Sequence, residues 1–326
     1  MVYPKLESFS SAVPPLESDL LQNTLWPEAQ KLYGHGNPLF CVASSVDGQL
    51  LASACKAAKP DEAAIFLWGG AARQWRVLGT IEGAHTLTIT QMAFSKTDAS
   101  ETSSSSSSSS SSHSKTKYRL LSVSRDRTIV VTQISLPSSS DDDSIVTQIL
   151  FRTNKSNGVH ARIIWSCDWA HDDAFFVTAS RDKKLVAWVE GGGGGKESGG
   201  GDDDVSADFR SSTPAILPDA CTAVACAPRL VSLSSSSSSS SSSPYLVAIG
   251  LDNGGIHLVL FDITSKLFSE LYRIPSNLGH HLTVRRLRFR PAVGRAENKT
   301  DEADLTLQLA SGGSDGFLRV FEVVDA

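Results

Sequence analysis

The segment VHARIIWSCDWAHDDAFFVTASRDKKLVAWVE, residues 159–190, decides the fold of this chain. A histidine precedes an apolar run that ends in Asp168-Trp169, and a polar turn leads to a second apolar run. The second run continues into Ser180-Arg181-Asp182, and a third run ends at Trp188. Short runs rich in β-branched and aromatic residues, bounded by polar turns, predict β-strands. The segment therefore predicts three strands joined by tight turns.

The same pattern recurs along the chain. A histidine stands nine residues before an aromatic residue three times, from His85 to Phe94, from His160 to Trp169 and from His280 to Phe289. A fourth copy begins at Gly34-His35, and a fifth, Ala220–Pro228, keeps the strand but lacks the histidine. Self-similarity of this kind indicates a repeat architecture. We count five repeats.

Each repeat continues with further strands. A second strand and a polar turn follow as LLASACKAAKPDE, YRLLSVSRDRT, AFFVTASRDKK, YLVAIGLDNGG and LQLASGGSDGF, and a third strand as AAIFLW, IVVTQI, LVAWV, IHLVLF and LRVFEV. A fourth, less patterned strand is predicted at RQWRVLGTI, SIVTQILFR and FSELYRI, where an edge strand would lie. Four strands in each repeat of roughly forty to fifty residues are typical of a β-propeller. The predicted fold is all-β, with about five four-stranded blades.

Composition and charge exclude several classes of protein. The chain has 326 residues, of which 40% are hydrophobic and 20% charged, so it can bury a sizeable core. The formal net charge of −5 disfavours a general nucleic-acid binder. The cysteines are scattered without a C-x-x-C pair, which predicts no zinc site and a reduced, intracellular protein. We find neither a secretory signal nor an apolar run long enough to span a membrane, and expect no membrane association.

Three low-complexity insertions interrupt the repeats. They contain the serine runs at 103–112 and 234–243 and the linker GGGGGKESGGGDDD at 191–204. Such compositions bury too little apolar surface to offset the entropy of ordering, so we predict disorder near 97–116, 191–213 and 232–243. The propeller portion is predicted over 31–326. Residues 1–30 are interpreted as an N-terminal segment with the outer strand of a preceding blade.

Two other motifs are rejected as sites. The glycine-rich run cannot be a phosphate-binding loop, because Gly195-Lys196 is followed by Glu197 and no helix is predicted after it. The runs Asp141–Asp143 and Asp202–Asp204 are interpreted as solvated loop charge, and no metal or cofactor is expected.

One basic cluster is a candidate contact surface. A period of two along the strand places Arg286, Arg288 and Arg290 on one face, and Arg285, Leu287 and Phe289 on the other. With Arg162 and Arg181 from another blade they predict a basic region on one rim, which could meet an acidic protein or RNA phosphate. The alternative is that these arginines form salt bridges between blades.

The repeats resemble WD repeats, and longer stretches resemble one family in particular. Residues 14–36 (PPLESDLLQNTLWPEAQKLYGHG), 51–59 (LASACKAAK), 121–128 (LSVSRDRT) and the blade at 159–188 are similar to the second subunit of the Elongator complex. The resemblance covers about the first 190 residues, and His280–Phe289 and Ser311–Phe321 fit it with more drift. It implies two consecutive propellers, of which this chain would be most of the second. Five blades are fewer than the usual seven, so we expect an incomplete ring.

The WD resemblance implies a hydrogen-bonded tetrad in each complete blade. In the blade at 159–190 it falls on His160, Ser180 (or Thr178), Asp182 and Trp188. A buried imidazole held by a carboxylate, and an indole N–H given an acceptor, satisfy groups that are costly to bury unpaired. His, Ser and Asp together could also suggest a hydrolase triad. Because the set recurs and decays from blade to blade, we interpret it as structural and expect no catalytic residue.

The Elongator resemblance implies a non-catalytic scaffold in a complex that modifies tRNA wobble uridines at C5. Its partners would be the large scaffold subunit and the catalytic radical-SAM/acetyltransferase subunit, with tRNA contacted indirectly or weakly and no small-molecule substrate. The expected location is cytoplasmic and nuclear. Two alternatives are a WD-repeat adaptor for signalling or cytoskeletal partners, and an enzyme built on carboxylates and histidines of the top face.

Overall fold

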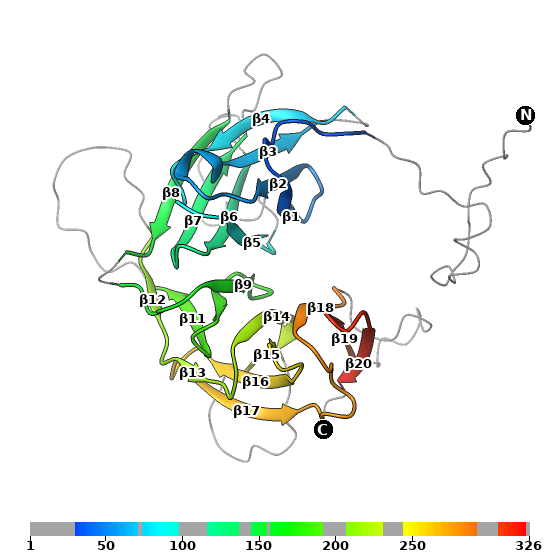
Figure 1. The fold of residues 1–326 in the computed structure, drawn as a ribbon. Coiled ribbons are helices and arrows are strands. Elements are labelled where there is room, and N and C mark those ends of the chain that lie inside the picture. The colour runs from blue at the N-terminus through cyan, green and yellow to red at the C-terminus, as the bar shows by residue number, and fades with distance from the viewer. Residues whose placement is uncertain are drawn as a thin grey trace, which may run out of the picture.

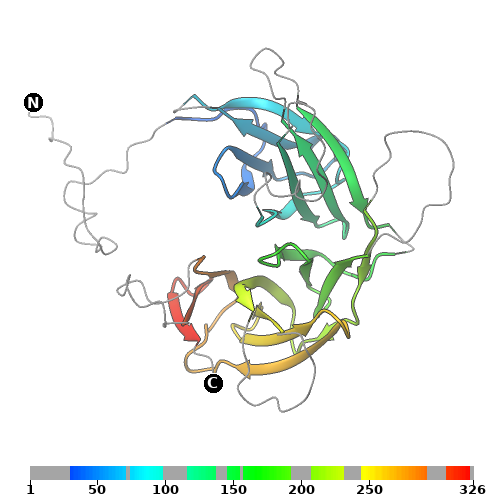
Figure 2. The ribbon, with the colours of Figure 1, turned by 180° about the vertical axis from the view of Figure 1, so that it is seen from behind.

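A computed structural model describes residues 30–70, 74–97, 116–136, 145–154, 157–191, 207–230, 244–291 and 306–323. These residues form five antiparallel sheets that follow one another in chain order. The sheets stand side by side around a central space (Figure 1), and the view from behind shows the same arc (Figure 2). The predicted all-β propeller architecture is therefore confirmed. Apart from Gln30, the predicted N-terminal segment lies outside the described residues.

The first strand of each repeat is the innermost strand of its sheet (Figure 1). These inner strands are β1 (Leu39–Ser44), β5 (Ile89–Phe94), β9 (Ile164–Trp169), β14 (Cys221–Leu230) and β18 (Val284–Phe289). The second strands are β2 (Leu50–Cys55), β6 (Lys117–Ser124), β10 (Phe175–Ser180), β15 (Tyr245–Leu251) and β19 (Leu307–Gly313). The third strands are β3 (Ile65–Gly69), β7 (Ile129–Ser135), β11 (Lys184–Glu190), β16 (Ile256–Asp262) and β20 (Leu318–Val323). All fifteen lie within the predicted strand segments or overlap them. The one helix of the described residues is a 3-10 turn, Pro60–Glu62.

Outer strands complete four of the sheets. Three of them, β4 (Arg76–Ile81), β8 (Val146–Arg152) and β17 (Leu267–Arg273), were expected from the sequence. The third sheet instead gains the short strands β12 (Phe209–Ser211) and β13 (Ala215–Ile216), which both pair with β11. The predicted insertion at 191–213 was therefore too long, because residues 207–213 are ordered against the blade. Phe209 is buried there, which gives this segment the apolar anchor that the glycine and aspartate run lacks.

The hydrophobic core lies between the sheets. The buried side chains form four clusters, and each cluster joins one blade to the next along the chain. Trp169, Phe176 and Trp188 of the third blade, for example, pack with Val131 and Phe151 of the second. Each middle blade is thus apolar on both faces and is stable only between two neighbours. No helix among the described residues is long and apolar enough to cross a membrane.

Polar groups also join the inner strands. Asp168 at the end of β9 is buried, and its carboxylate accepts hydrogen bonds from Lys96 Nζ after β5 at 2.8 Å and from the Cys226 amide in β14 at 2.9 Å. Ser166 Oγ donates to Gln91 Oε1 of β5 at 2.9 Å and accepts the Val224 amide of β14 at the same distance. The second, third and fourth blades are therefore joined by side chains of β9.

A complete hydrogen-bonded tetrad is found in the third blade. His160 Nε2 lies 2.8 Å from Thr178 Oγ1, which also accepts the Trp188 indole N–H at 3.0 Å. On its other side, His160 Nδ1 lies 3.3 Å from Asp182 Oδ2. The Asp182 carboxylate also accepts the backbone amides of Ala161 and Lys184. The four side chains thus connect the start of the inner strand to the second strand, the turn and the third strand.

The hydroxyl in this tetrad belongs to Thr178, so its assignment to Ser180 was wrong. Ser180 lies two residues further along β10, where its hydroxyl bonds to the carbonyls of Arg162 and Ile163 and accepts the Asp182 amide. Residues i and i+2 of a strand share a face, so periodicity alone could not separate the two candidates. Distance decides between them, because only Thr178 reaches both His160 and Trp188.

The other blades retain parts of the tetrad. His35, His85 and His280 each place Nε2 within 2.8 Å of the hydroxyl two residues before the end of the second strand. Those hydroxyls belong to Ser53, Ser122 and Ser311. The turn aspartate is present in the second and fifth blades as Asp126 and Asp315. An indole partner remains in the first blade, where Trp68 donates to Ser53. Four of the five blades therefore keep the His–hydroxyl pair and lose other members of the tetrad, whereas the fourth blade has also lost the histidine.

Replacing Thr178 by Val is expected to destabilise the fold. The substitution keeps the shape but leaves His160 Nε2 and the Trp188 indole buried without a partner, at a cost of about 2–4 kcal/mol in the free energy of unfolding. Thr132→Val in the neighbouring blade is a matched control, because the Thr132 hydroxyl is buried and has no partner among the described residues. It should change stability little or raise it. Denaturant unfolding measures both, and equal losses would contradict the assignment.

Acid should weaken the tetrad through Asp182. Burial by itself raises the pKa of Asp182, but hydrogen bonds and the charge of His160 outweigh it and hold the pKa at about 2, below the ordinary 3.8. A lowered folded-state pKa gives stability that is present above the unfolded value and is lost as the pH falls toward the folded one. Between about pH 4 and pH 2 the free energy of unfolding should therefore fall more steeply for the unmodified chain than for Asp182→Asn. Parallel curves would contradict this.

Candidate functional site: the bulge pocket

Every inner strand carries a β-bulge at the same place. The residue pairing skips one position between Leu39 and Cys41, and the other four inner strands repeat this near their first residues. The extra residues are Phe40, Thr90, Trp165, Thr222 and Arg285. A bulge leaves one residue out of the ladder and re-aims its side chain. Five side chains are therefore turned out of their sheets at one level of the central space.

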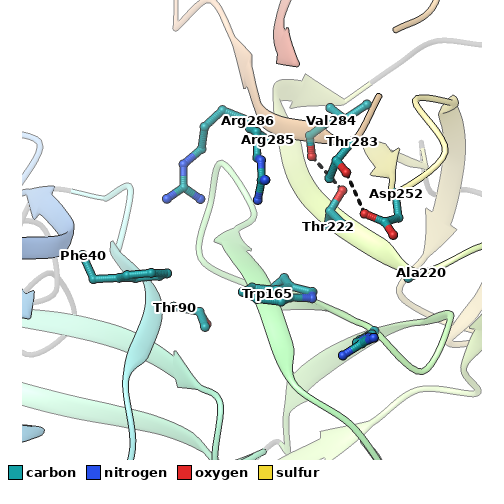
Figure 3. Close-up of a pocket in the computed structure, with 11 residues that line it drawn as sticks. Phe40, Thr90, Trp165, Ala220, Thr222, Asp252, Thr283, Val284, Arg285 and Arg286 are labelled. Atoms are coloured by element: carbon teal, nitrogen blue, oxygen red, sulfur yellow. Dashed lines mark hydrogen bonds between the residues drawn. The ribbon is translucent and has the colours of Figure 1, made fainter. Parts of the chain in front are cut away.

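These five residues line one cavity of about 430 Å³, which we call the bulge pocket (Figure 3). The rest of its lining comes from adjoining loops and turns and from β18, namely Arg181, Ala220, Asp252, Thr283, Val284 and Arg286. Arg181 and Asp252 belong to the turns that follow the second strands of the third and fourth blades. The pocket thus opens at the end of the propeller where those turns lie.

The bulge residues act in two ways. Thr90 Oγ1 donates to the Ile164 carbonyl of the next inner strand at 2.5 Å, and Thr222 Oγ1 donates to the Val284 carbonyl at 2.7 Å. The threonines therefore join neighbouring blades. Phe40, Trp165 and Arg285 instead project toward the cavity (Figure 3). Phe40 is 38% exposed, although it is a large apolar residue.

Positive charge dominates the bulge pocket. Three arginines line it, and within the described part of the chain their side chains bond only to neutral oxygens: Arg285 Nε donates to Ser314 Oγ at 2.7 Å and Arg286 Nη1 to Gln91 Oε1 at 2.8 Å. Asp252 is the single carboxylate in the lining, and Thr283 Oγ1 donates to it at 2.7 Å. Within the described residues no ion pair neutralises these guanidinium groups.

The structure separates the five arginines proposed from the sequence. Arg181 and Arg286 line the bulge pocket, whereas Arg162, Arg288 and Arg290 are not part of its lining. Arg162 and Arg288 are exposed and Arg290 is half-buried. Arg286, Arg288 and Arg290 do lie opposite the buried Leu287 and Phe289.

Arg285 was placed on the wrong face by the sequence. The bulge at Arg285 breaks the period of two, so this residue is exposed instead of sharing the buried face of Leu287. The sequence did not identify Phe40, Trp165 or Thr222 as candidate contact residues. These residues share one position, the second residue of each inner strand. The repeat pattern in the sequence does not show that this residue is left out of the strand pairing.

The cysteine side chains lie away from solvent. Burial raises the pKa of the Cys41 thiol to about 12, although the nearby Arg286 charge opposes that rise, so this thiol is not a thiolate at neutral pH. All five cysteines are buried and free. No group of three or more His, Cys, Asp or Glu side chains in the described ranges is placed to hold a metal ion.

Comparison with known proteins adds the family. A family model described as "WD domain, G-beta repeat" matches residues 26–59 and 153–188. Elongator complex protein 2 of Danio rerio is 39% identical over 320 residues, which is 96% of this chain and 35% of that protein. The Homo sapiens protein of the same name is 36% identical over 95% of this chain and 34% of its own length.

More distant relatives carry the same name. Elongator complex protein 2 of Arabidopsis thaliana is 31% identical over 94% of the chain and 31% of its own length. The chain spans about a third of the length of the curated relatives it matches first. Because the likeness runs along nearly the whole chain and the fold is that of WD repeats, the chain belongs to the Elongator complex protein 2 family.

Proposed function

We propose that this chain is a non-catalytic scaffold in an Elongator-type complex and that it supports C5 modification of tRNA wobble uridines. The observation that carries the proposal is family membership along nearly the whole chain. Its partners would be the large scaffold subunit and the catalytic radical-SAM/acetyltransferase subunit of that complex. The proposal includes the cytoplasmic and nuclear location expected from the resemblance.

The repeated geometry supports a non-catalytic role. His160, Thr178 and Asp182 have the residue types of a hydrolase triad, but the Thr178 side chain is fully buried and its oxygen already accepts the Trp188 indole. A nucleophile must reach its substrate, and this hydroxyl cannot. The same His–hydroxyl pair recurs in the first, second and fifth blades, which supports a structural task for it.

The form of the molecule suits presentation of other subunits. Each of the three middle blades is held by hydrophobic clusters on both sides and by the polar groups of β9, so the turns at one end of these blades keep fixed relative positions. Binding residues on loops above a rigid scaffold are a common arrangement in proteins. Arg162 and Arg288, both exposed, could contact an acidic partner from that scaffold.

Deleting the gene should reduce C5-modified wobble uridines in bulk tRNA, as measured by mass spectrometry of nucleosides. The expected reason is that the catalytic subunit loses the scaffold that positions it on the anticodon. Reintroducing the intact gene should restore the modification. Unchanged modification in the deletion strain would remove the tRNA part of the proposal.

Co-purification distinguishes the scaffold from its rivals. The tagged chain should recover the Elongator catalytic subunit. Recovery of signalling or cytoskeletal proteins without that subunit would favour the adaptor, and turnover by the isolated chain would favour an enzyme.

Charge reversal tests the exposed arginines. Arg162→Glu and Arg288→Glu should each lower partner or tRNA binding by up to about fivefold, because exposed ion pairs contribute little individually. The loss should shrink at high salt, since surface charges are screened. Lys266→Glu, in the turn before the outer strand β17, is the control and should bind normally. If all three variants behave alike, the arginines have no specific contact.

A further inference from the structure

We propose that the bulge pocket binds a nucleoside phosphate, with its arginines on the phosphate and its aromatic rings against the base. Neither the scaffold role nor the likeness to relatives requires such a site. The inference stands on the lining of the pocket alone.

The first step is the surplus of hydrogen-bond donors. Each guanidinium has five N–H groups, and the hydrogen bonds that Arg285 and Arg286 make to other described residues use one donor each. Both bonds end on neutral oxygens, so the positive charges are not compensated. Arginines that surround a cavity without carboxylate partners are suited to bind an anion, and the guanidinium fork matches phosphate in particular.

The second step is the pair of aromatic side chains. Phe40 and Trp165 come from the inner strands of different blades, yet their rings lie near the same cavity, below Arg285 and Arg286 in the view of Figure 3. Trp165 is only half-buried, and its ring is not part of the hydrophobic clusters between the blades. Exposed aromatic faces next to arginines are the surfaces on which proteins stack single nucleobases.

The third step is size and polarity. A volume of about 430 Å³ lies in the range of small-ligand pockets. Asp252 adds an acceptor for a sugar hydroxyl or an exocyclic amine, because the hydrogen bond that Thr283 Oγ1 donates to it occupies only its Oδ1 atom. An inorganic anion would leave the aromatic rings unused, and an uncharged ring would leave the arginines unused. A nucleoside phosphate uses both.

The same chemistry is offered by a free nucleotide and by an unpaired nucleotide of an RNA strand. Binding of adenosine monophosphate, adenosine, inorganic phosphate and a single-stranded RNA pentanucleotide to the purified full chain separates these sources. Adenosine monophosphate should bind saturably and more tightly than adenosine or phosphate. Tighter binding of the pentanucleotide would assign the site to an RNA strand, and equal or weaker binding to the free nucleotide.

Matched variants test the residues. Arg285→Gln should weaken binding of adenosine monophosphate about tenfold or more, because a hydrogen bond to a charged group is lost. Arg125→Gln removes the same charge from the exposed turn after β6, outside the lining of the pocket, and should bind normally. Trp165→Leu should weaken the binding of adenosine monophosphate about fivefold or more but leave the binding of phosphate unchanged, because it removes only the stacking surface. Arg181→Gln, on another blade, repeats the arginine test should the Arg285 variant fail to fold.

Four results would overturn the proposal. They are the absence of saturable binding of either nucleotide probe, equal losses in Arg285→Gln and Arg125→Gln, no effect of Trp165→Leu, and tighter binding of a phosphoserine pentapeptide than of adenosine monophosphate. Circular dichroism of each variant distinguishes loss of binding from loss of fold. The tRNA experiment on the deletion strain is independent of all four, so the pocket and the scaffold role can fail separately.

Discussion

The carboxylate of Asp168 joins three of the five sheets, and the positions of the inner strands depend on it. A buried carboxylate is costly unless it is paired, and here Lys96 of the second blade and the Cys226 amide of the fourth satisfy it. Removing either partner would leave an uncompensated charge in the core, which costs far more than a surface contact. Ser166, two residues earlier on the same face of β9, links the same two neighbouring blades through Gln91 and Val224.

Fixing the inner strands also fixes their bulges. Because Gln91 Oε1 accepts both Ser166 and Arg286, the polar chain that begins in the third blade extends across the central space to the fifth. The hydrogen bond from Thr90 Oγ1 to the Ile164 carbonyl also joins one bulge to the inner strand of the next blade. The side chains that line the bulge pocket therefore stand on strands held from several directions. That rigidity favours a binding site, because ligand binding then costs the protein little conformational entropy.

Sequence reasoning succeeded where the repeat is strict. Short apolar runs bounded by polar turns predicted the strands around Trp169 and Trp188, because a sheet buried between two others is apolar on both faces. It failed where distance matters more than order. Ser180 and Thr178 share a face of β10, so the sequence could not show which of the two hydroxyls reaches His160. The strand β12 was missed because only Phe209 marks it, directly after a glycine-rich and acidic run.

The bulge pocket was missed for a related reason. A repeat analysis aligns what is common to the blades and treats the remainder as drift. The bulge position is common to all five inner strands, but its occupants are two threonines, two aromatic residues and an arginine. A residue outside the ladder is not bound by the pleat of its sheet, so its type can vary without loss of the fold. The His–hydroxyl pairs of four blades are more constrained, because losing one member of a pair leaves the other buried and unpaired. In such a molecule the His–hydroxyl pairs hold the blades together. The bulge positions keep their geometry but vary in residue type, so they are where one propeller can differ from another in what it binds.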